Sequence, residues 1–226
     1  MKLTAKSFAG MVDATAIGAN LSFSSHRDLV EYSKKYEFAQ IFGFASYYSY
    51  LLENMKGCVT GVGGGVGSSL GAGTELTEVK VFEAKKYIEM GCDEIDMWMN
   101  IAAFRNGEYE YVLEDLKAVR DVVPSDHNLK VIIECAILSP EQIEKACELV
   151  ILSGADFVKS GTGNLGACTV EHARLMLRGA NNKIKVKCAG GIRDLETVKR
   201  MVDLGVHRIG MNVYSAEAMI RQLPDE

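Results

Sequence analysis

Residues 130–159 read KVIIECAILSPEQIEKACELVILSGADFVK, and the pattern of this stretch predicts the fold of the whole chain. Apolar runs at both of its ends enclose a segment in which the apolar residues have helical spacing. Ser139, Pro140 and Gln142 are the residue types found at the N-cap, the first turn and the third position of a helix. A strand, a helix and a second strand in this order are typical of a parallel β/α unit.

The same alternation of apolar runs and helical segments recurs along the chain. The expected strands lie at residues 10–14, 38–42, 58–62, 94–99, 130–135, 155–159, 184–188 and 208–211. Eight repeats of about 25 to 30 residues fit a closed barrel better than an open sheet, and no G-x-G-x-x-G loop follows the first strand. No Pro- or Ser-rich linker interrupts the pattern. We therefore expect an α/β fold with a single (β/α)8 TIM barrel domain over residues 1–226.

The composition excludes several classes of partner. The formal net charge is -5 and no run of Lys or Arg occurs, so nucleic acid is not an expected partner. No stretch of about 18 apolar residues is present, and the first residues are too polar to begin a signal peptide. The six cysteines are scattered without a Cys-x-x-Cys pair, which indicates reduced thiols in a cytoplasmic protein. The sequence locates no interface for a homodimer, and that assembly is left open.

Two lysines end neighbouring strands of the predicted barrel. Lys159 ends one apolar strand and Lys187 ends the next. Functional residues of TIM barrels lie at the carboxyl ends of the strands, so both side chains fall where an active site is expected. Adjacent strands lie about 4.8 Å apart, and two ammonium groups at that spacing disfavour each other's charge. One amine should therefore lose its proton well below the usual pH range, and Schiff-base chemistry requires such a neutral amine.

Asp96 is the third candidate catalytic residue. It lies on a strand of the same even-numbered set as Lys159, and alternate strands share layers of side chains inside a TIM barrel. A carboxylate there pairs with a lysine and shuttles protons during imine formation. Each residue also has a simpler interpretation, because a strand-end lysine is commonly a solvated rim charge and a lone aspartate is consistent with a loop cap. The four histidines are isolated and no metal-binding spacing occurs, so we expect neither a metal nor another cofactor.

The glycine run between residues 61 and 67 has two interpretations. Its backbone would suit a phosphate-binding nest, but the Gly-Lys-Ser/Thr of a P-loop is absent. We interpret the run as a mobile loop that follows the third strand near the mouth of the site.

Several stretches resemble the deoxyribose-phosphate aldolase family. GADFVKSGTG at 154–163 is similar to the Schiff-base strand of that family, and VKCAGGIR at 186–193 is similar to its second-lysine strand. EIDM at 94–97 resembles the family's aspartate strand, and VDAT at 12–15 stands where the family has Asp-x-Thr. TEVKVFEAK at 77–85 resembles the helix after its third strand. These stretches follow the family's order over nearly the whole chain.

The resemblance implies a class I aldolase that reversibly cleaves 2-deoxy-D-ribose 5-phosphate to glyceraldehyde 3-phosphate and acetaldehyde. Its partner would thus be a small aldehyde or sugar phosphate. Lys159 would form the imine, Lys187 would be the neighbouring charge that eases its deprotonation, and Asp96 would relay protons through Lys187 and a water. The substrate-binding residues implied by the resemblance or by the polar groups nearby are Asp13, Thr15, Thr162, Gly163, Gly190, Gly191 and Asn212.

The chain departs from the family at the last strand. GMNVY at 210–214 replaces a Gly-Thr-Ser-Ser-Gly-like turn whose hydroxyls and amides hold the substrate phosphate, and Ser215 is displaced from it. Backbone amides at Gly190, Gly191 and the following helix N-terminus still suit an anion. One alternative is therefore a related Schiff-base aldolase for a different, non-phosphorylated aldehyde. Another is a barrel that binds a metabolite without turnover, which the buried lysine pair disfavours.

Overall fold

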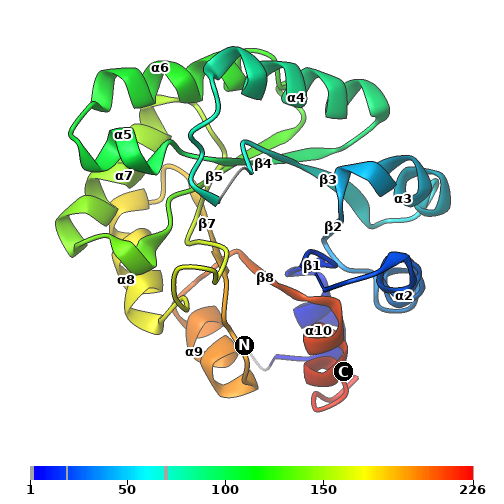
Figure 1. The fold of residues 1–226 in the computed structure, drawn as a ribbon. Coiled ribbons are helices and arrows are strands. Elements are labelled where there is room, and N and C mark those ends of the chain that lie inside the picture. Colours follow the sequence, from blue (N-terminus) through cyan, green and yellow to red (C-terminus); the bar gives the residue numbers. More distant parts are fainter. Residues whose placement is uncertain (1–2, 19, 69–70, 226) are drawn as a thin grey trace.

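Eight parallel strands close into a barrel in a computed structural model that describes residues 3–18, 20–68 and 71–225 (Figure 1). The strands are β1 (Val12–Thr15), β2 (Gln40–Phe42), β3 (Gly61–Val66), β4 (Glu94–Trp98), β5 (Asn128–Ile132), β6 (Phe157–Lys159), β7 (Lys185–Ala189) and β8 (Arg208–Asn212). They pair in chain order, and β8 pairs with β1 to close the barrel. The predicted (β/α)8 barrel is confirmed.

Helices alternate with the strands and form the outer layer seen in Figure 1. The helices are α1 (Ala5–Ala9), α2 (Phe23–Tyr36), α3 (Tyr48–Met55), α4 (Thr77–Met90), α5 (Ile101–Arg105), α6 (Tyr109–Arg120), α7 (Pro140–Leu152), α8 (Val170–Ala180), α9 (Leu195–Asp203) and α10 (Val213–Ile220), with short 3-10 turns at Ala45–Tyr47 and Cys135–Ile137. Within the described ranges, none of these helices is long and apolar enough to cross a membrane.

The start of α7 forms as its sequence predicts. Ser139 is the N-cap, and its hydroxyl accepts a hydrogen bond from the backbone N–H of Gln142. The Gln142 side chain in turn accepts from the backbone N–H of Ser139 at 2.9 Å. Pro140 lies in the first turn, where a missing N–H has no cost. This capping box fixes the direction of the chain as it leaves β5.

The glycine run at residues 61–67 is not the loop that its composition indicates. Residues Gly61–Val66 form β3, and the prediction of a mobile loop there is wrong. A Cβ at Gly63 would lie 2.2 Å from the Phe42 ring, and one at Gly64 would lie 2.9 Å from Tyr87. The glycines therefore make room for an aromatic ring on each face of the strand. Because glycine is depleted in strands, the sequence pattern places this strand too early in the chain.

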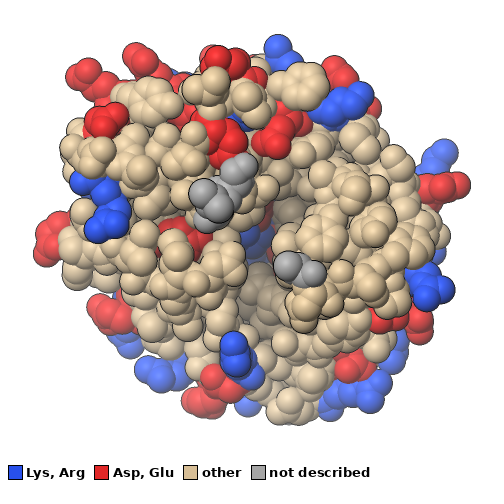
Figure 2. Space-filling model, in the orientation of Figure 1, with Lys and Arg blue, Asp and Glu red and all other residues tan. Residues whose placement is uncertain are grey.

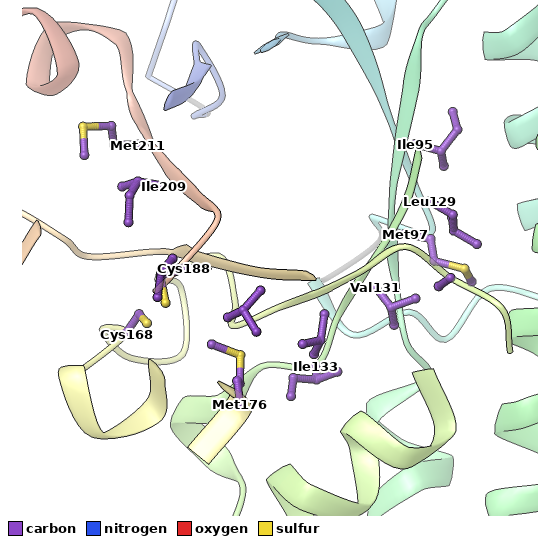
Figure 3. Close-up of a cluster of buried hydrophobic side chains, with 14 of the residues drawn as sticks. Ile95, Met97, Leu129, Val131, Ile133, Cys168, Met176, Cys188, Ile209 and Met211 are labelled. Atoms are coloured by element: carbon purple, nitrogen blue, oxygen red, sulfur yellow. The ribbon is translucent and has the colours of Figure 1, made fainter. Parts of the chain in front are cut away.

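The main hydrophobic core lies between the barrel wall and the helices. Figure 3 shows Ile95 and Met97 of β4 and Leu129 and Val131 of β5 pointing toward the helical layer. All four side chains are fully buried. Side chains alternate across a strand, so the residues between them point into the barrel. Those inward positions carry the charged residues of the site.

Candidate active site

A cavity of about 540 Å³ opens at the carboxyl ends of the strands. Figure 2 shows it as a central hollow with basic atoms visible at depth. Its lining residues are Thr15, Ile17, Trp98, Lys159, Gly161, Thr162, Asn164, Lys187, Ala189, Gly190, Gly191, Ile192, Arg193, Gly210, Met211, Asn212 and Ser215. The strands meet at this face, so residues far apart in sequence surround one space.

Asp96 joins the two predicted lysines at the bottom of this cavity. Its Oδ2 atom accepts a hydrogen bond of 2.8 Å from Lys159 Nζ and another of 2.8 Å from Lys187 Nζ. Strand register explains the meeting, because Lys159 of β6 is paired directly with Lys187 of β7. Asp96 points inward from β4, on the other side of β5. We call these three residues the cavity-facing group.

The two lysines differ in exposure. The Lys159 side chain is 12% exposed, whereas the Lys187 side chain is 1% exposed. Both line the cavity, and Lys159 is the more accessible of the two. Burial lowers the pKa of Lys187 to about 8, with Lys130 and Lys159 acting in the same direction and the two aspartates Asp13 and Asp96 opposing. Lys187 thus exchanges its proton near neutral pH.

A second set of charges lies beneath the first. Lys130, Asp13 and Glu94, with the partly exposed Arg208 at the edge, form this buried group. Asp13 Oδ2 lies 2.7 Å from Lys130 Nζ and 2.6 Å from Lys187 Nζ, and Asp13 Oδ1 lies 2.7 Å from Arg208. Lys130 also pairs with Glu94 and lies 3.5 Å from Asp96 Oδ1. The two groups therefore form one continuous network of ion pairs.

The sequence interpretation missed Lys130, Arg208 and Glu94. The available signal was the period of two along each strand. Glu94 is two residues before Asp96, and Lys130 pairs in register with Phe157, two residues before Lys159. Counting back by two from Asp96 would have placed Glu94 inside the barrel, whereas Lys130 and Arg208 follow only from the register of neighbouring strands.

The network shifts the protonation of its members. Burial raises the pKa of Asp13, but Lys130, Lys187 and Arg208 outweigh it and hold that pKa far below its usual value. Asp96 is similarly held ionised by its lysine neighbours against the effect of burial. Burial lowers the pKa of Lys130, yet its three carboxylate neighbours raise it overall. Four basic side chains thus meet three carboxylates, and the excess positive charge favours release of one lysine proton.

Comparison with known proteins identifies the family of this barrel. Residues 66–215 match the model of the DeoC/LacD family aldolases. The chain is a DeoC/LacD family aldolase. A relative from Mycoplasma capricolum subsp. capricolum, named deoxyribose-phosphate aldolase, is 39% identical, and the match covers 93% of this chain and 94% of the relative.

Two further comparisons agree with this assignment. Deoxyribose-phosphate aldolase 2 from Bacillus licheniformis is 38% identical over 89% of this chain and 90% of that protein. A crystal structure of a Coccidioides immitis protein superposes with a TM-score of 0.91 at 31% identity, over 98% of this chain and 87% of that one. The resemblance drawn from the sequence is therefore confirmed at the level of the family.

Five of the seven expected substrate-binding residues line the cavity of this DeoC/LacD aldolase. They are Thr15, Thr162, Gly190, Gly191 and Asn212. The Thr15 hydroxyl donates to the Met211 carbonyl at 3.2 Å. Asp13 lies one layer lower, fully buried within the ion-pair network. Gly163 lies behind the lining, against the turn after β7.

The turns after β6 and β7 pack backbone against backbone. Gly163 and Gly190 have φ values of +88° and +92°, which favour glycine. A Cβ on Gly190 would lie 2.3 Å from the Gly163 nitrogen. Glycine at both positions therefore lets the two turns approach closely and form one wall of the cavity.

Two further residues shape the cavity: Glu134 holds the turn after β6, and Trp98 lies on the opposite wall. Glu134, after β5, has a φ of +51°, and its Oε1 atom accepts a hydrogen bond of 3.0 Å from the Thr162 backbone N–H. Burial raises the pKa of the Glu134 carboxyl. Across the cavity, the Lys159 amine lies 5.9 Å from the centroid of the Trp98 ring. The sequence interpretation gave neither Glu134 nor Trp98 a role.

The turn after β8 differs from the Gly-Thr-Ser-Ser-Gly-like turn that the family resemblance leads us to expect. Asn212 caps α10, since its Oδ1 atom accepts a hydrogen bond of 3.0 Å from the Tyr214 backbone N–H. The Tyr214 hydroxyl donates to Asp28 at 2.6 Å. Tyr214 is therefore engaged outside the cavity, while Asn212 and Ser215 face it.

Proposed function

We propose that this aldolase reversibly cleaves 2-deoxy-D-ribose 5-phosphate to glyceraldehyde 3-phosphate and acetaldehyde through an imine on Lys159. One observation carries the proposal. Lys159 is the accessible lysine of the cavity-facing group, and its amine is held 2.8 Å from a carboxylate that also binds a second lysine. The names of the relatives support the substrate.

The cleavage begins at the Lys159 amine. In its neutral form the amine adds to the C1 carbonyl of the open-chain sugar, and the carbinolamine takes up a proton and loses water to leave an iminium. The C3 hydroxyl then gives up its proton, the C2–C3 bond breaks, and its electron pair forms an enamine on Lys159. Glyceraldehyde 3-phosphate leaves, C2 takes up a proton, and water releases acetaldehyde and the free amine.

Lys187 and Asp96 serve the proton transfers in this scheme. Lys187 has its pKa lowered to about 8 by burial, so near neutral pH it both gives and accepts a proton. Asp96 stays ionised, orients both amines and stabilises the iminium. A water links this pair to the substrate, and Asp13 acts through Lys187, to which it is paired at 2.6 Å.

The phosphate occupies the end of the cavity beside β7 and β8. Gly190, Gly191 and Arg193 line that end, and they offer backbone amides and a guanidinium to an anion. Thr15, Thr162 and Asn212 also line the cavity and contact the sugar hydroxyls or a bound water. Gly163 keeps the Gly190 turn in place.

A second candidate function has one observation in its favour. The turn after β8 presents Asn212 and Ser215 to the cavity, and Asn212 Oδ1 already accepts a backbone hydrogen bond. This turn suits a substrate without phosphate. The ratio of kcat/KM for 2-deoxyribose 5-phosphate to that for 2-deoxyribose separates the two candidates. A ratio above about 100 supports the phosphorylated substrate, because charge-assisted hydrogen bonds to phosphate each contribute about 1.5–3 kcal/mol.

The proposal also includes the domain organisation, the partners, the cellular location and the assembly of the chain. Residues 1–226 act as one domain on a small molecule, and the charge of -5 disfavours nucleic acid. The cysteines are free thiols and five of the six are buried, which supports a cytoplasmic location. Exposed Leu76 and Phe82, at the start and outer face of α4, support a homodimer. Sedimentation equilibrium measures that assembly directly.

Borohydride trapping tests the central step. The protein is incubated with acetaldehyde near pH 7, reduced, and analysed by intact mass and peptide mapping. The expected result is a single ethyl adduct on the peptide that contains Lys159, and none in Lys159→Leu. An adduct confined to another lysine would remove Lys159 from its role. A folded protein that gives no adduct with acetaldehyde or with larger carbonyl compounds would favour a barrel that binds a metabolite without turnover.

A further inference from the structure

The indole of Trp98 forms one end of the cavity. Trp98 is the last residue of β4, and it lies in register with Ile132 of β5, which in turn pairs with Lys159. Its ring centroid is 5.9 Å from Lys159 Nζ. The indole therefore lies beside the reacting amine, two strands away from it.

The position of this residue is fixed by the residues around it. Gly65 of β3 lies behind the ring, where a Cβ would be 3.6 Å from the indole Cζ3 atom. The Trp98 carbonyl accepts a hydrogen bond of 3.4 Å from Lys80 Nζ. Lys80 is itself fully buried and lies 2.6 Å from Asp115. A buried ion pair thus holds the backbone at the end of β4, from which the ring extends along the cavity wall.

The polar atom of the indole has no partner in the part of the chain that the structure describes. Trp98 Nε1 is buried and makes no hydrogen bond there. Because this atom is out of reach of solvent, the indole presents its ring carbons, and not its N–H, to the cavity. Trp98 therefore offers a bound molecule an apolar surface.

The strand order places Trp98 on the donor side of Lys159. The phosphate end of the cavity belongs to β7 and β8, on one side of β6, whereas Trp98 belongs to β4, on the other side. The carbons that remain on Lys159 after cleavage are those of the donor aldehyde. The indole therefore faces the donor and not the phosphorylated product.

The distance from the amine to the ring limits the size of the donor. The methyl carbon of bound acetaldehyde lies about 2.5 Å from the imine nitrogen, two bonds away. In the direction of the indole it comes within about 3.5 Å of the ring, which is ordinary contact between carbon atoms. One more carbon in that direction would overlap the ring.

We propose that Trp98 selects the donor aldehyde, admitting two carbons and excluding donors with a third. This inference rests on the proposed function, because it assigns the donor end of the same site. Trp98 acts by contact with the donor and takes no part in the proton transfers.

The test compares acetaldehyde and propanal as donors, with glyceraldehyde 3-phosphate as the common acceptor. Trp98→Val should raise the ratio of kcat/KM for propanal to that for acetaldehyde at least about 10-fold, because one methylene in a fitted pocket changes the rate by about 10- to 200-fold. Trp98→Phe keeps an aromatic ring beside the amine, so the ratio should stay within about 3-fold of the wild-type value. Gly65→Ala is the matched control behind the ring and should leave the ratio unchanged.

Trp98→Leu, closer to the indole in volume, should give an intermediate ratio and replaces Trp98→Val if that variant fails to fold. A ratio that is the same in the wild type and in the folded Val or Leu variant would overturn the selection by Trp98. If the wild type still gives an acetaldehyde adduct on Lys159, that result leaves the proposed function intact. Absence of the adduct in the wild type would instead remove the proposed function, and the donor selection with it.

Discussion

The cavity-facing group and the buried group both combine basic side chains with carboxylates, and they differ in how fully their charges are paired. Lys130, in the buried group, lies within 4 Å of three carboxylates and is fully buried. Lys159, in the cavity-facing group, is paired with one carboxylate and is 12% exposed. Lys187 lies between them and contacts both aspartates. The comparison indicates that the pairing around each lysine decides whether it stabilises the barrel or performs chemistry.

Replacement of Lys159 should have the largest effect on activity and only a small effect on stability. Lys159→Leu should lower the rate of cleavage by at least about 10³-fold, because no other accessible amine replaces the nucleophile. Asp96 keeps Lys187 as a partner, so the free energy of unfolding should change by less than about 2 kcal/mol. Steady-state kinetics and urea unfolding measure the two quantities. If Lys159→Leu still cleaves the substrate, the cavity-facing group does not have the catalytic role that we assign to it.

Lys130→Met should have the opposite effect, with its main cost in stability. The change leaves Asp13 and Glu94 with fewer positive partners in the interior, and removing one member of a buried pair costs about 3–5 kcal/mol. Urea unfolding at neutral pH, with Lys159→Leu as the matched comparison, gives the difference. The comparison fails if Lys159→Leu proves to be the more destabilising of the two.

Lys187→Leu should shift the pH dependence of imine formation. Burial lowers the pKa of Lys187 to about 8, so below that pH the wild-type enzyme carries a second positive charge beside the site of imine formation. Lys187→Leu removes that charge, so half-maximal borohydride trapping should move to higher pH. Trapping with acetaldehyde over a pH series checks this shift. An unmoved midpoint would show that Lys187 does not act on Lys159 through its charge.

Lys185→Gln should have the smallest effect. Lys185 begins β7, two residues before Lys187, but it is exposed at the opposite end of the barrel. Its amine lies 5.3 Å from the centroid of the Phe157 ring, and an exposed contact of this kind contributes about 0.5–1 kcal/mol, which limits the expected loss of stability. Cleavage should stay at the wild-type rate. A large loss of either quantity would show that position along β7, and not exposure and pairing, controls the role of a lysine.

Strand ends and helix caps could be predicted because they depend on local pattern. The Ser139 cap and Lys159 at the end of β6 follow from the residues beside them in sequence, whereas β7 runs two residues past Lys187 to Ala189. Strand β3 could not be placed well, because its glycines are explained by Phe42 and Tyr87, which are distant in sequence. The buried group shows the same limit. Asp13 and Lys130 are 117 positions apart, and only barrel closure brings them together.

The substrate-facing wall was the least predictable part of the site. Trp98 ends a strand and has the sequence features of an ordinary core residue. Its position beside the Lys159 amine depends on the register of β4, β5 and β6. Glu134 similarly acquires its contact with Thr162 from a left-handed backbone after β5, which the sequence alone does not indicate.

Trp98 is the only tryptophan in the chain. Its ring centroid lies 5.9 Å from the amine of Lys159, so the tryptophan fluorescence of the protein comes from the site itself. Addition of a carbonyl compound to that amine changes the charge and the polarity next to the indole, and the emission should change with it. Stopped-flow fluorescence can therefore follow occupancy of Lys159 in the unlabelled protein, from the first encounter to release.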